Sequence, residues 1–538
     1  MKFNLFTRTM IAAIAIVAVS CGRSDKAGPP VPKDASIVVH INAGSLSKKL
    51  SWNEIKQTRW FSDMYAEADD SLARKLMDDP GSSGINVQED MVFFVKKQGR
   101  GAYMVFEGSV NDTEAFQNFN KQMNKDASVT RGGDLNIMKL RGNGVLSWNE
   151  KRFVYIMNAP GMASPFASFG SSMEPYSFPA DSLQMFATVL YDLPSDQSMY
   201  KDDRYAATMK EDGDLHIWMN NEQTYGGMAA GMIGMLKVNA LFDKNATGMT
   251  LNFENGKISM KTKQFFSKEV LKVMEKYPSK DVAADVVNRI PSQDVAAAFV
   301  MNYPPEGLRE FLKLVGFDGA LNGYLQQIGY TMDEFVKANK GDLVIAVTDV
   351  QFKKDSLGNQ RNDSGEPTAT KSGGTDMKFL FATSINDRPA FDKMVGAISA
   401  QLGQQGITDA FPSITYKIDN DWFVAGNTET QVTQFLTGNG TKQPFASRIS
   451  GHPFGAYIDF QYLMNSANAG ISDTTAQRAL DASISMWKDV LMTGGRVKNG
   501  SVNYDVELNL VDKNANSLTQ LNKYLDQLSA FKKAKVQF

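Results

Sequence analysis

The stretch FEGSVNDTEAF, residues 106–116, returns as FATSINDRPAF at residues 381–391. In both copies a short apolar run ends at a serine, an Asn-Asp pair follows, and apolar residues then fall at helical spacing. Asn and Asp side chains can accept hydrogen bonds from the free N–H groups of a first helical turn. Both stretches therefore predict a strand that leads into a capped helix, a unit that builds a core and carries no obvious chemistry.

Two further echoes extend this similarity over most of the chain. Asn255-Gly256 and Asn499-Gly500 each precede alternating apolar residues, which is the strongest short signal for a β-hairpin. Each hairpin is followed by a predicted helix with a Lys-Tyr pair. We therefore expect a tandem duplication, with a first half at residues 32–280, a linker at 281–290 and a second half at 291–538.

Strand and helix patterns are mixed within each half. The predicted fold class is α+β, with a mainly antiparallel sheet and packed helices in each half. Met91–Val95 and Leu343–Val347 each predict the first strand of a hairpin whose second strand is the repeated stretch. In the second half, residues 353–376 replace the turn and contain almost no apolar side chain, so they predict a mobile hairpin insertion.

The composition is that of an ordinary globular protein. With 538 residues the chain should form two or more domains. The 57 basic and 59 acidic residues nearly cancel, so we expect no nucleic-acid partner.

The N-terminus predicts export and lipid anchoring. Lys2 and Arg8 precede an apolar run from Met10 to Val19, which is too short to span a membrane but suits a signal peptide at residues 1–20. Cys21, the only cysteine of the sequence, follows Ser20 as in a bacterial lipoprotein cleavage site, so we expect Cys21 to be lipidated. Residues 21–31 are rich in Gly, Pro and charge and predict a flexible tether. The anchor predicts a membrane as one partner.

The sequence contains no recognisable catalytic set. The three histidines, His40, His216 and His452, show no metal-ligand spacing, and we interpret them as core or surface residues. The adjacent acids at 69–70, 78–79 and 211–212 are typical of solvated faces and caps. The acidic cluster at 419–421 predicts a hairpin turn rather than a calcium site, because the glycine and distal glutamate of an EF-hand are missing. We therefore predict no catalytic residue, no metal site and no cofactor; whether the protein is an enzyme stays open, with a non-catalytic role favoured.

One apolar segment supports a second idea. In YGGMAAGMIGML, residues 225–236, Met228, Met232 and Met235 fall on one helical stripe. Flexible methionine surfaces suit adaptable binding of apolar ligands, although tight core packing is the favoured interpretation of such a stripe. These three methionines are the candidate ligand-binding residues.

The whole layout resembles an uncharacterised family of Bacteroidota envelope lipoproteins, a domain of unknown function. The resemblance rests on the Ser20-Cys21 box, the proline-containing spacer and the S-[VI]-N-D-x-x-A-F motif in each half. It implies an outer-membrane lipoprotein of the cell envelope, on either the periplasmic or the surface face, and it implies no activity.

Three functions follow from these observations. The leading hypothesis is a lipid-anchored binding or scaffold protein with a possible envelope protein partner. The alternative is a carrier of a hydrophobic ligand or lipid. A further alternative is a carboxylate-dependent hydrolase, which would need two acids in one cleft.

Overall fold

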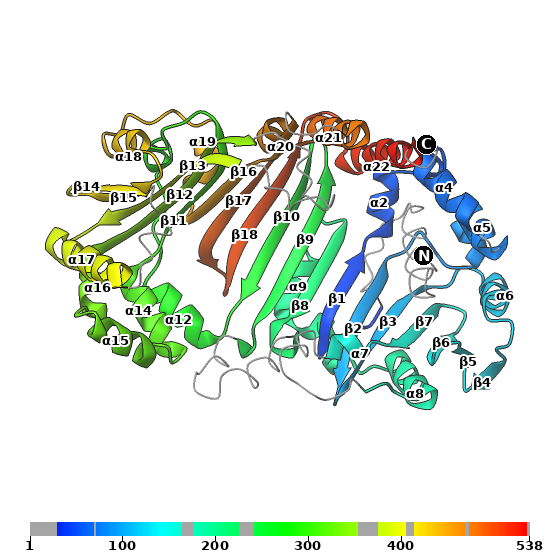
Figure 1. Ribbon diagram of the computed structural model, residues 1–538. Coiled ribbons are helices and arrows are strands. Elements are labelled where there is room, and N and C mark those ends of the chain that lie inside the picture. The colour runs from blue at the N-terminus through cyan, green and yellow to red at the C-terminus, as the bar shows by residue number, and fades with distance from the viewer. Residues whose placement is uncertain are drawn as a thin grey trace, which may run out of the picture. The chain divides into compact units, whose positions relative to one another are not determined.

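The computed structural model describes residues 29–68, 71–163, 176–224, 242–352, 375–404, 414–468 and 473–534. It divides into two compact units (Figure 1). Among the described residues, unit 1 contains most of the chain up to Ser267 together with residues 515–530, and unit 2 contains residues 268–514. The predicted signal peptide and Cys21 lie outside the described residues.

Unit 1 is built on one antiparallel sheet. Its strands pair in the order β10-β9-β8-β1-β2-β3-β7-β6-β5-β4. The strands are β1 (Ala35–Ile41), β2 (Met91–Gln98), β3 (Gly101–Ser109), β4 (Val129–Gly132), β5 (Leu135–Leu140), β6 (Gly144–Trp148), β7 (Arg152–Asn158), β8 (Leu215–Asn220), β9 (Ala246–Glu254) and β10 (Lys257–Phe265).

The helices of unit 1 come from both ends of the sequence. They are α2 (Ala43–Lys49), α3 (Trp52–Lys56), α4 (Arg59–Glu67), α5 (Ser71–Asp78), η1 (Pro80–Ser83), α6 (Thr113–Met123), α7 (Pro160–Ala163), α8 (Ala180–Tyr191), η3 (Ser195–Gln197), η4 (Met199–Lys201), α9 (Asp203–Met209) and most of α22 (Ser517–Ala534). α8 and α9 bury Leu183, Ala187 and Tyr205 against one face of the sheet, which forms the main core of this unit.

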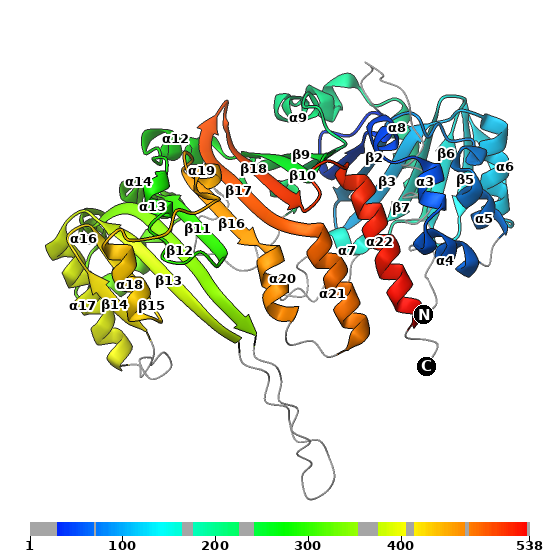
Figure 2. The same cartoon turned by 90° about the horizontal axis from the view of Figure 1, so that it is seen from above.

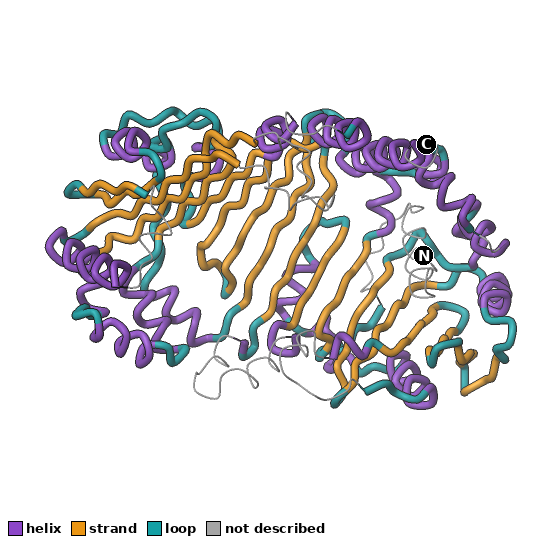
Figure 3. The backbone as a smooth tube through the Cα atoms, in the orientation of Figure 1, coloured by secondary structure: helices purple, strands orange, loops and turns teal. Residues whose placement is uncertain are grey.

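The strands of unit 2 pair antiparallel in the order β18-β17-β16-β11-β12-β13-β15-β14. Figure 3 draws the strands in orange. The strands are β11 (Val295–Asn302), β12 (Asn339–Phe352), β13 (Thr375–Ile385), β14 (Thr415–Ile418), β15 (Trp422–Gly426), β16 (Phe454–Asp459), β17 (Trp487–Lys498) and β18 (Ser501–Leu510). The helices are α12 (Lys268–Lys276), α13 (Ala284–Val287), α14 (Pro305–Leu314), α15 (Asp318–Gln327), α16 (Met332–Ala338), α17 (Arg388–Gln404), α18 (Glu429–Leu436), α19 (Ala446–Ile449), α20 (Phe460–Asn468) and α21 (Thr474–Met486). Its main core lies between one sheet face and helices α13, α18 and α19.

The predicted α+β class with mainly antiparallel strands is confirmed. Both repeated stretches form a strand that leads into a capped helix, β3 into α6 and β13 into α17. Asp112 Oδ1 accepts from Ala115 N, and Asp387 Oδ1 accepts from Ala390 N, each at 2.9 Å. Phe116 and Phe391, one turn further on, are buried. The predicted Asn-Gly hairpins form as β9–β10 and β17–β18. The duplication itself stays a prediction.

The compact units do not coincide with the predicted halves of the sequence. α22, from the end of the chain, packs in unit 1 beside α4 (Figure 2), where Trp60 Nε1 donates to Asn522 Oδ1 at 3.0 Å. α12, from the predicted first half, packs on α14 in unit 2. Inside the predicted linker, residues 284–287 form α13, and Val287 and Ile290 are fully buried because they complete the apolar core of unit 2.

In two segments that we predicted to be flexible, the residues at the C-terminal end belong to the folded structure. Thr375 and Asp376, placed in the predicted insertion, pair with Phe352 and Gln351 and extend the β12–β13 ladder, while residues 353–374 lie outside the described residues. Val31, placed in the predicted tether, is fully buried, and its carbonyl accepts from Met199 N at 2.8 Å. A hydrogen-bonded core residue cannot belong to a free tether.

Candidate binding site

The sheet face of unit 2 that points away from its main core is apolar. One row of directly paired residues crosses five strands, from Met492 through Ala456, Phe299 and Ile345 to Phe381. Ile345, in the middle of the row, is 39% exposed, and the other four are half-buried. Because alternate residues of a strand point to opposite faces, this row is the reverse side of the strands that build the core.

Unit 1 has an equivalent row on the sheet face that points away from α8 and α9. It runs from Met249 through Ile217, Val39 and Phe93 to Phe106, and all five residues are half-buried. Phe106 and Phe381, the first residues of the two repeated stretches, occupy the same end of their rows. We call these two surfaces, each defined by its row, the apolar faces of unit 1 and unit 2.

The chemistry of the apolar faces is uniform. The ten side chains of the two rows are aliphatic, aromatic or methionine, and none can form an ordinary hydrogen bond. The backbone groups of these strands are used in the sheet ladders, so the ten side chains present only hydrocarbon and sulfur, while Thr262 and Tyr155, paired with the two ends of the unit 1 row, carry hydroxyl groups. Such a surface gains free energy by covering apolar area and makes no directional polar contact.

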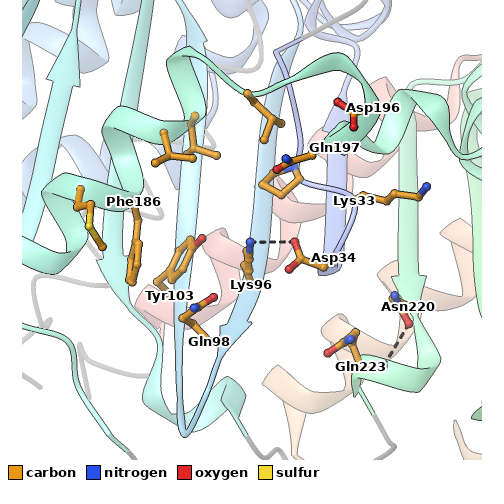
Figure 4. Close-up of a pocket in the computed structure, with 15 residues that line it drawn as sticks. Lys33, Asp34, Lys96, Gln98, Tyr103, Phe186, Asp196, Gln197, Asn220 and Gln223 are labelled. Atoms are coloured by element: carbon orange, nitrogen blue, oxygen red, sulfur yellow. Dashed lines mark hydrogen bonds and ion pairs between the residues drawn. The ribbon is translucent and has the colours of Figure 1, made fainter.

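A cleft lies beside α8 in unit 1 (Figure 4). This α8 cleft has a volume of about 590 Å³. Its α8 wall is apolar and includes Met185 and Val189, which are 58% and 53% exposed. In Figure 4 Phe186 stands next to Tyr103, and their rings are stacked with centroids 5.1 Å apart.

The opposite wall of the α8 cleft is polar and electrically balanced. Lys96 Nζ lies 2.9 Å from Asp34 Oδ1, and the side chains of Gln98, Asn220 and Gln223 complete this wall. Burial, and then the negative charge of Asp34, raise the pKa of the Tyr103 hydroxyl. The cleft thus offers amide and charged groups on one side and apolar groups on the other.

A row of buried polar residues lies beneath α8 and α9, on the core face of the unit 1 sheet. His216 pairs with His40, and Glu107 follows on β3, separated from His40 by Val92. Burial, and then the charge of His216, lower the pKa of His40 to about 4, and burial lowers that of His216. Burial raises the pKa of Glu107 to about 8, against the effect of the nearby Arg152. At neutral pH both imidazoles and most of the Glu107 carboxyl groups are therefore uncharged.

His40 and His216 are buried, in line with the interpretation of the histidines as core or surface residues. His40 Nε2 lies 3.4 Å from Asp90 Oδ2, and His216 Nε2 lies 2.8 Å from the Glu211 carbonyl oxygen. The Nδ1 atom of each ring is buried and has no hydrogen-bond partner among the described residues. Sequence reasoning missed Glu107 altogether. The available signal was a glutamate inside an apolar strand, on the face that buries Val105.

The predicted candidate residues have different outcomes. Met228, Met232 and Met235 lie outside the described residues, as does the lipidation site Cys21. The acidic cluster forms the predicted hairpin turn, in which Asp419 Oδ1 accepts from Trp422 N at 2.7 Å.

The predicted acid pairs have no common role in the structure. The pair at 69–70 is not described. Asp79 caps η1, and Asp78 accepts from the Tyr65 hydroxyl at 3.1 Å. Glu211 forms an ion pair with Lys263. In the part of the chain that the structure describes, no group of three or more His, Cys, Asp or Glu side chains could hold a metal ion.

A family model described as a domain of unknown function, DUF4836, matches residues 30–360, more than half of the chain. The chain belongs to this family. The predicted membership of an uncharacterised family is thus confirmed, while the lipoprotein character and the bacterial group stay predictions. No curated protein matches the chain.

Solved structures of TP0453 are similar to this chain. Its crystal forms III, IV and I have 8%, 12% and 8% sequence identity and TM-scores of 0.25, 0.25 and 0.24. The matches cover 49%, 47% and 47% of this chain and 87% of each TP0453 chain. TM-scores this low carry no inference about fold or function. Among the described helices, none is both long enough and apolar enough to cross a bilayer.

Proposed function

We propose that this DUF4836 protein is a lipid-anchored, non-catalytic binding protein of the cell envelope that holds the acyl chain of a lipid against its apolar faces. The observation that carries the proposal is the half-buried apolar row in each unit. Core positions on the other side of the same strands are fully buried, as for Val344 and Ala382. In unit 1 other clusters of buried side chains cover part of Phe93 and Phe106, and in unit 2 Ile345 stays 39% exposed.

The chemistry of the rows favours a hydrocarbon over a protein as the occupant. Protein partners form about one hydrogen bond per 100–200 Å² of interface, whereas the row side chains offer none. An acyl chain needs no hydrogen bond, and flexible methionines such as Met249 and Met492 adapt to its shape. Covering the exposed part of one half-buried side chain of this size is worth roughly 1 kcal/mol, so several side chains of one row together suit an acyl chain.

The sequence supports the location. A signal peptide that ends before Cys21 predicts a lipid anchor, and an anchor on one residue keeps the protein beside a membrane, which is a source of lipid. We place the protein at the outer membrane, on either face, with the bilayer as its partner and room for an envelope protein partner.

The same order of strand pairing in both units supports the proposal that the units arose by duplication. Each order begins with a hairpin, β10–β9 or β18–β17, and continues through β8 or β16 and the first strand of the unit, β1 or β11, to the hairpin that contains the repeated stretch. In each unit the repeated phenylalanine lies at the equivalent position of the apolar row. Two copies of one unit would give the protein two acyl-chain surfaces of similar design.

The test uses cis-parinaric acid, a fluorescent fatty acid, and two variants of the whole chain. In Ile345→Asp a carboxylate enters the centre of the unit 2 row. The control is Ile398→Asp, because Ile398 in α17 is similarly exposed at 45% but lies outside the row. We expect Ile345→Asp to weaken binding at the unit 2 face at least about tenfold and so to lower the amount of bound fatty acid by about half, since an unpaired charge cannot be covered by hydrocarbon and the unit 1 face is unchanged.

The control variant should bind the fatty acid within about twofold of the unchanged protein, because Ile398 lies outside the row. A twofold change corresponds to less than about 0.5 kcal/mol of binding free energy. Native mass spectrometry of gently purified protein should also detect bound lipid. Equal binding by both variants, or an unchanged protein that binds no fatty acid, would contradict the proposal.

A further inference from the structure

Glu107 occupies a place where the fold does not require a carboxylic acid. In unit 1 it follows the repeated Phe106 and pairs with Val92. At the same place in unit 2, Ala382 follows Phe381 and pairs with Val344. Ala382 is fully buried in the core, so a methyl group suffices to build this strand. The acid is a feature of unit 1 alone.

The surroundings of Glu107 compensate its charge only through the nearby Arg152. The residue is fully buried, and neither carboxylate oxygen has a hydrogen-bond partner among the described residues. The hydroxyls of Tyr200 and Tyr205, which are packed over this part of the sheet, are also buried without a partner of good geometry. The titratable and charged groups on the surrounding elements are Arg152 on β7, Tyr191 on α8, Tyr200 on η4, Tyr205 on α9, His40 on β1 and Asp90 just before β2.

Arg152, the cation that acts on the pKa of Glu107, already makes contacts with α8. Its Nη2 donates to the Leu190 carbonyl oxygen at 2.8 Å, and its guanidinium lies 4.3 Å from the centre of the Tyr191 ring. Leu190 and Tyr191 are the last residues of α8, so Arg152 holds this helix end on the sheet. An ionised Glu107 needs either Arg152 or water, and both require the cover formed by α8 and α9 to move.

We propose that Glu107 is a proton-operated latch, closed when the acid is neutral and loosened when it is ionised, that controls how firmly α8 and α9 cover the core of unit 1. The latch does not depend on the acyl-chain ligand, because it lies on the opposite face of the sheet. It does bear on the α8 cleft, since Leu190 and Phe186 line that cleft.

The direction of the pH dependence follows from proton linkage. Burial raises the pKa of Glu107 from its ordinary 4.5 to about 8 in the closed state. Once α8 and α9 open, water reaches the acid and its pKa returns toward the ordinary value. At Glu107 the open state therefore binds fewer protons between these values, which makes opening about tenfold more favourable per pH unit from pH 5 to 7. Exposure of His40 and His216, whose pKa values burial lowers, contributes in the opposite direction, so the effect of Glu107 is measured as a difference from variants that lack the acid. Below pH 4.5 the acid is protonated in both states and its contribution ends.

Hydrogen–deuterium exchange on the full-length protein tests the latch. The measured quantity is the opening constant of α8, corrected for the pH dependence of intrinsic exchange, at pH 5, 6 and 7. Helix α18, which covers the core of unit 2, is the internal reference. The variants are Glu107→Gln, which keeps the shape, and Glu107→Ala, which installs the residue of unit 2. Glu114→Gln on the surface of α6 is the control.

We expect the change of the α8 opening constant from pH 5 to 7, relative to α18, to be about 70-fold larger in the unchanged protein and in Glu114→Gln than in Glu107→Gln and Glu107→Ala. The opposing proton uptake by His40 and His216 on opening is the same in all four proteins, so it cancels in this comparison. An α8 to α18 ratio with the same pH dependence in the unchanged protein and in both Glu107 variants overturns the latch.

Discussion

Replacing Lys49 by methionine should destabilise unit 1 strongly, because it removes the cation from a fully buried carboxylate. Lys49 Nζ lies 2.5 Å from Asp214 Oδ2, and the Asp214 side chain has no exposed surface. Asp214 would keep two hydrogen bonds, from Ser45 Oγ and Phe253 N, each at 2.6 Å. Removing one partner of a buried ion pair costs 3–5 kcal/mol, and the two remaining bonds favour the lower limit, about 3 kcal/mol.

The assay is amide exchange of β8 and β9 in low urea, since Asp214 precedes β8 and accepts from β9. A loss of about 3 kcal/mol should raise their opening constant more than 100-fold. Lys139→Met is the matched control, because the ion pair of Lys139 with Asp181 is exposed and worth about 0.5 kcal/mol or less. The double variant Lys49→Met/Asp214→Asn should recover part of the loss, because it leaves no unpaired charge. A Lys49→Met protein within 0.5 kcal/mol of the unchanged protein would refute the reasoning.

Three further outcomes are expected. Cys21→Ala should move the protein from the membrane fraction to the soluble fraction and abolish palmitate labelling, and unchanged membrane attachment would rule out the anchor. Asp112→Ala and Asp387→Ala should each cost about 1 kcal/mol in urea unfolding, because each removes one N-cap bond, and a loss in only one would contradict their equivalence. Ending the chain at Asn516 removes α22, and the emission of Trp60 should shift to the red as its ring becomes exposed and loses Asn522. Unchanged emission would show that α22 does not cover this helix.

The local elements could be predicted because their signals are local. The Asn-Asp pair before Phe116 and Phe391 marks a helix start through hydrogen bonds within one turn. Asn-Gly between alternating residues marks a tight hairpin, because both residues adopt left-handed backbone angles readily. In the structure Asn499 and Gly500 have φ of 52° and 74°.

The arrangement of distant segments could not be predicted in the same way. That α22 packs beside Trp60 depends on contacts more than 450 residues apart, which no spacing in the sequence encodes. The predicted linker contains Val287 and Ile290. Both side chains are apolar, but only the tertiary structure shows that they are buried in the core of unit 2.

The partial exposure of the apolar faces could not be predicted from the sequence for a related reason. Val39 and Phe299 belong to apolar strands that look two-sided in sequence, and such strands are usually buried on both faces. Whether a second layer covers them is decided by the tertiary fold. Glu107 was visible as an acid in an apolar strand, but its missing partners are a property of the packed core.

Photo-crosslinking with a diazirine-bearing fatty acid tests the central claim most directly, because mass spectrometry then identifies the residues that touch the hydrocarbon. The account predicts labels on the two rows, at residues such as Phe93 and Phe106 in unit 1 and Phe299 and Ile345 in unit 2, and competition by unlabelled palmitate. Labels confined to the α8 cleft or to exposed helix residues such as Ile398, with the rows unlabelled, would contradict it.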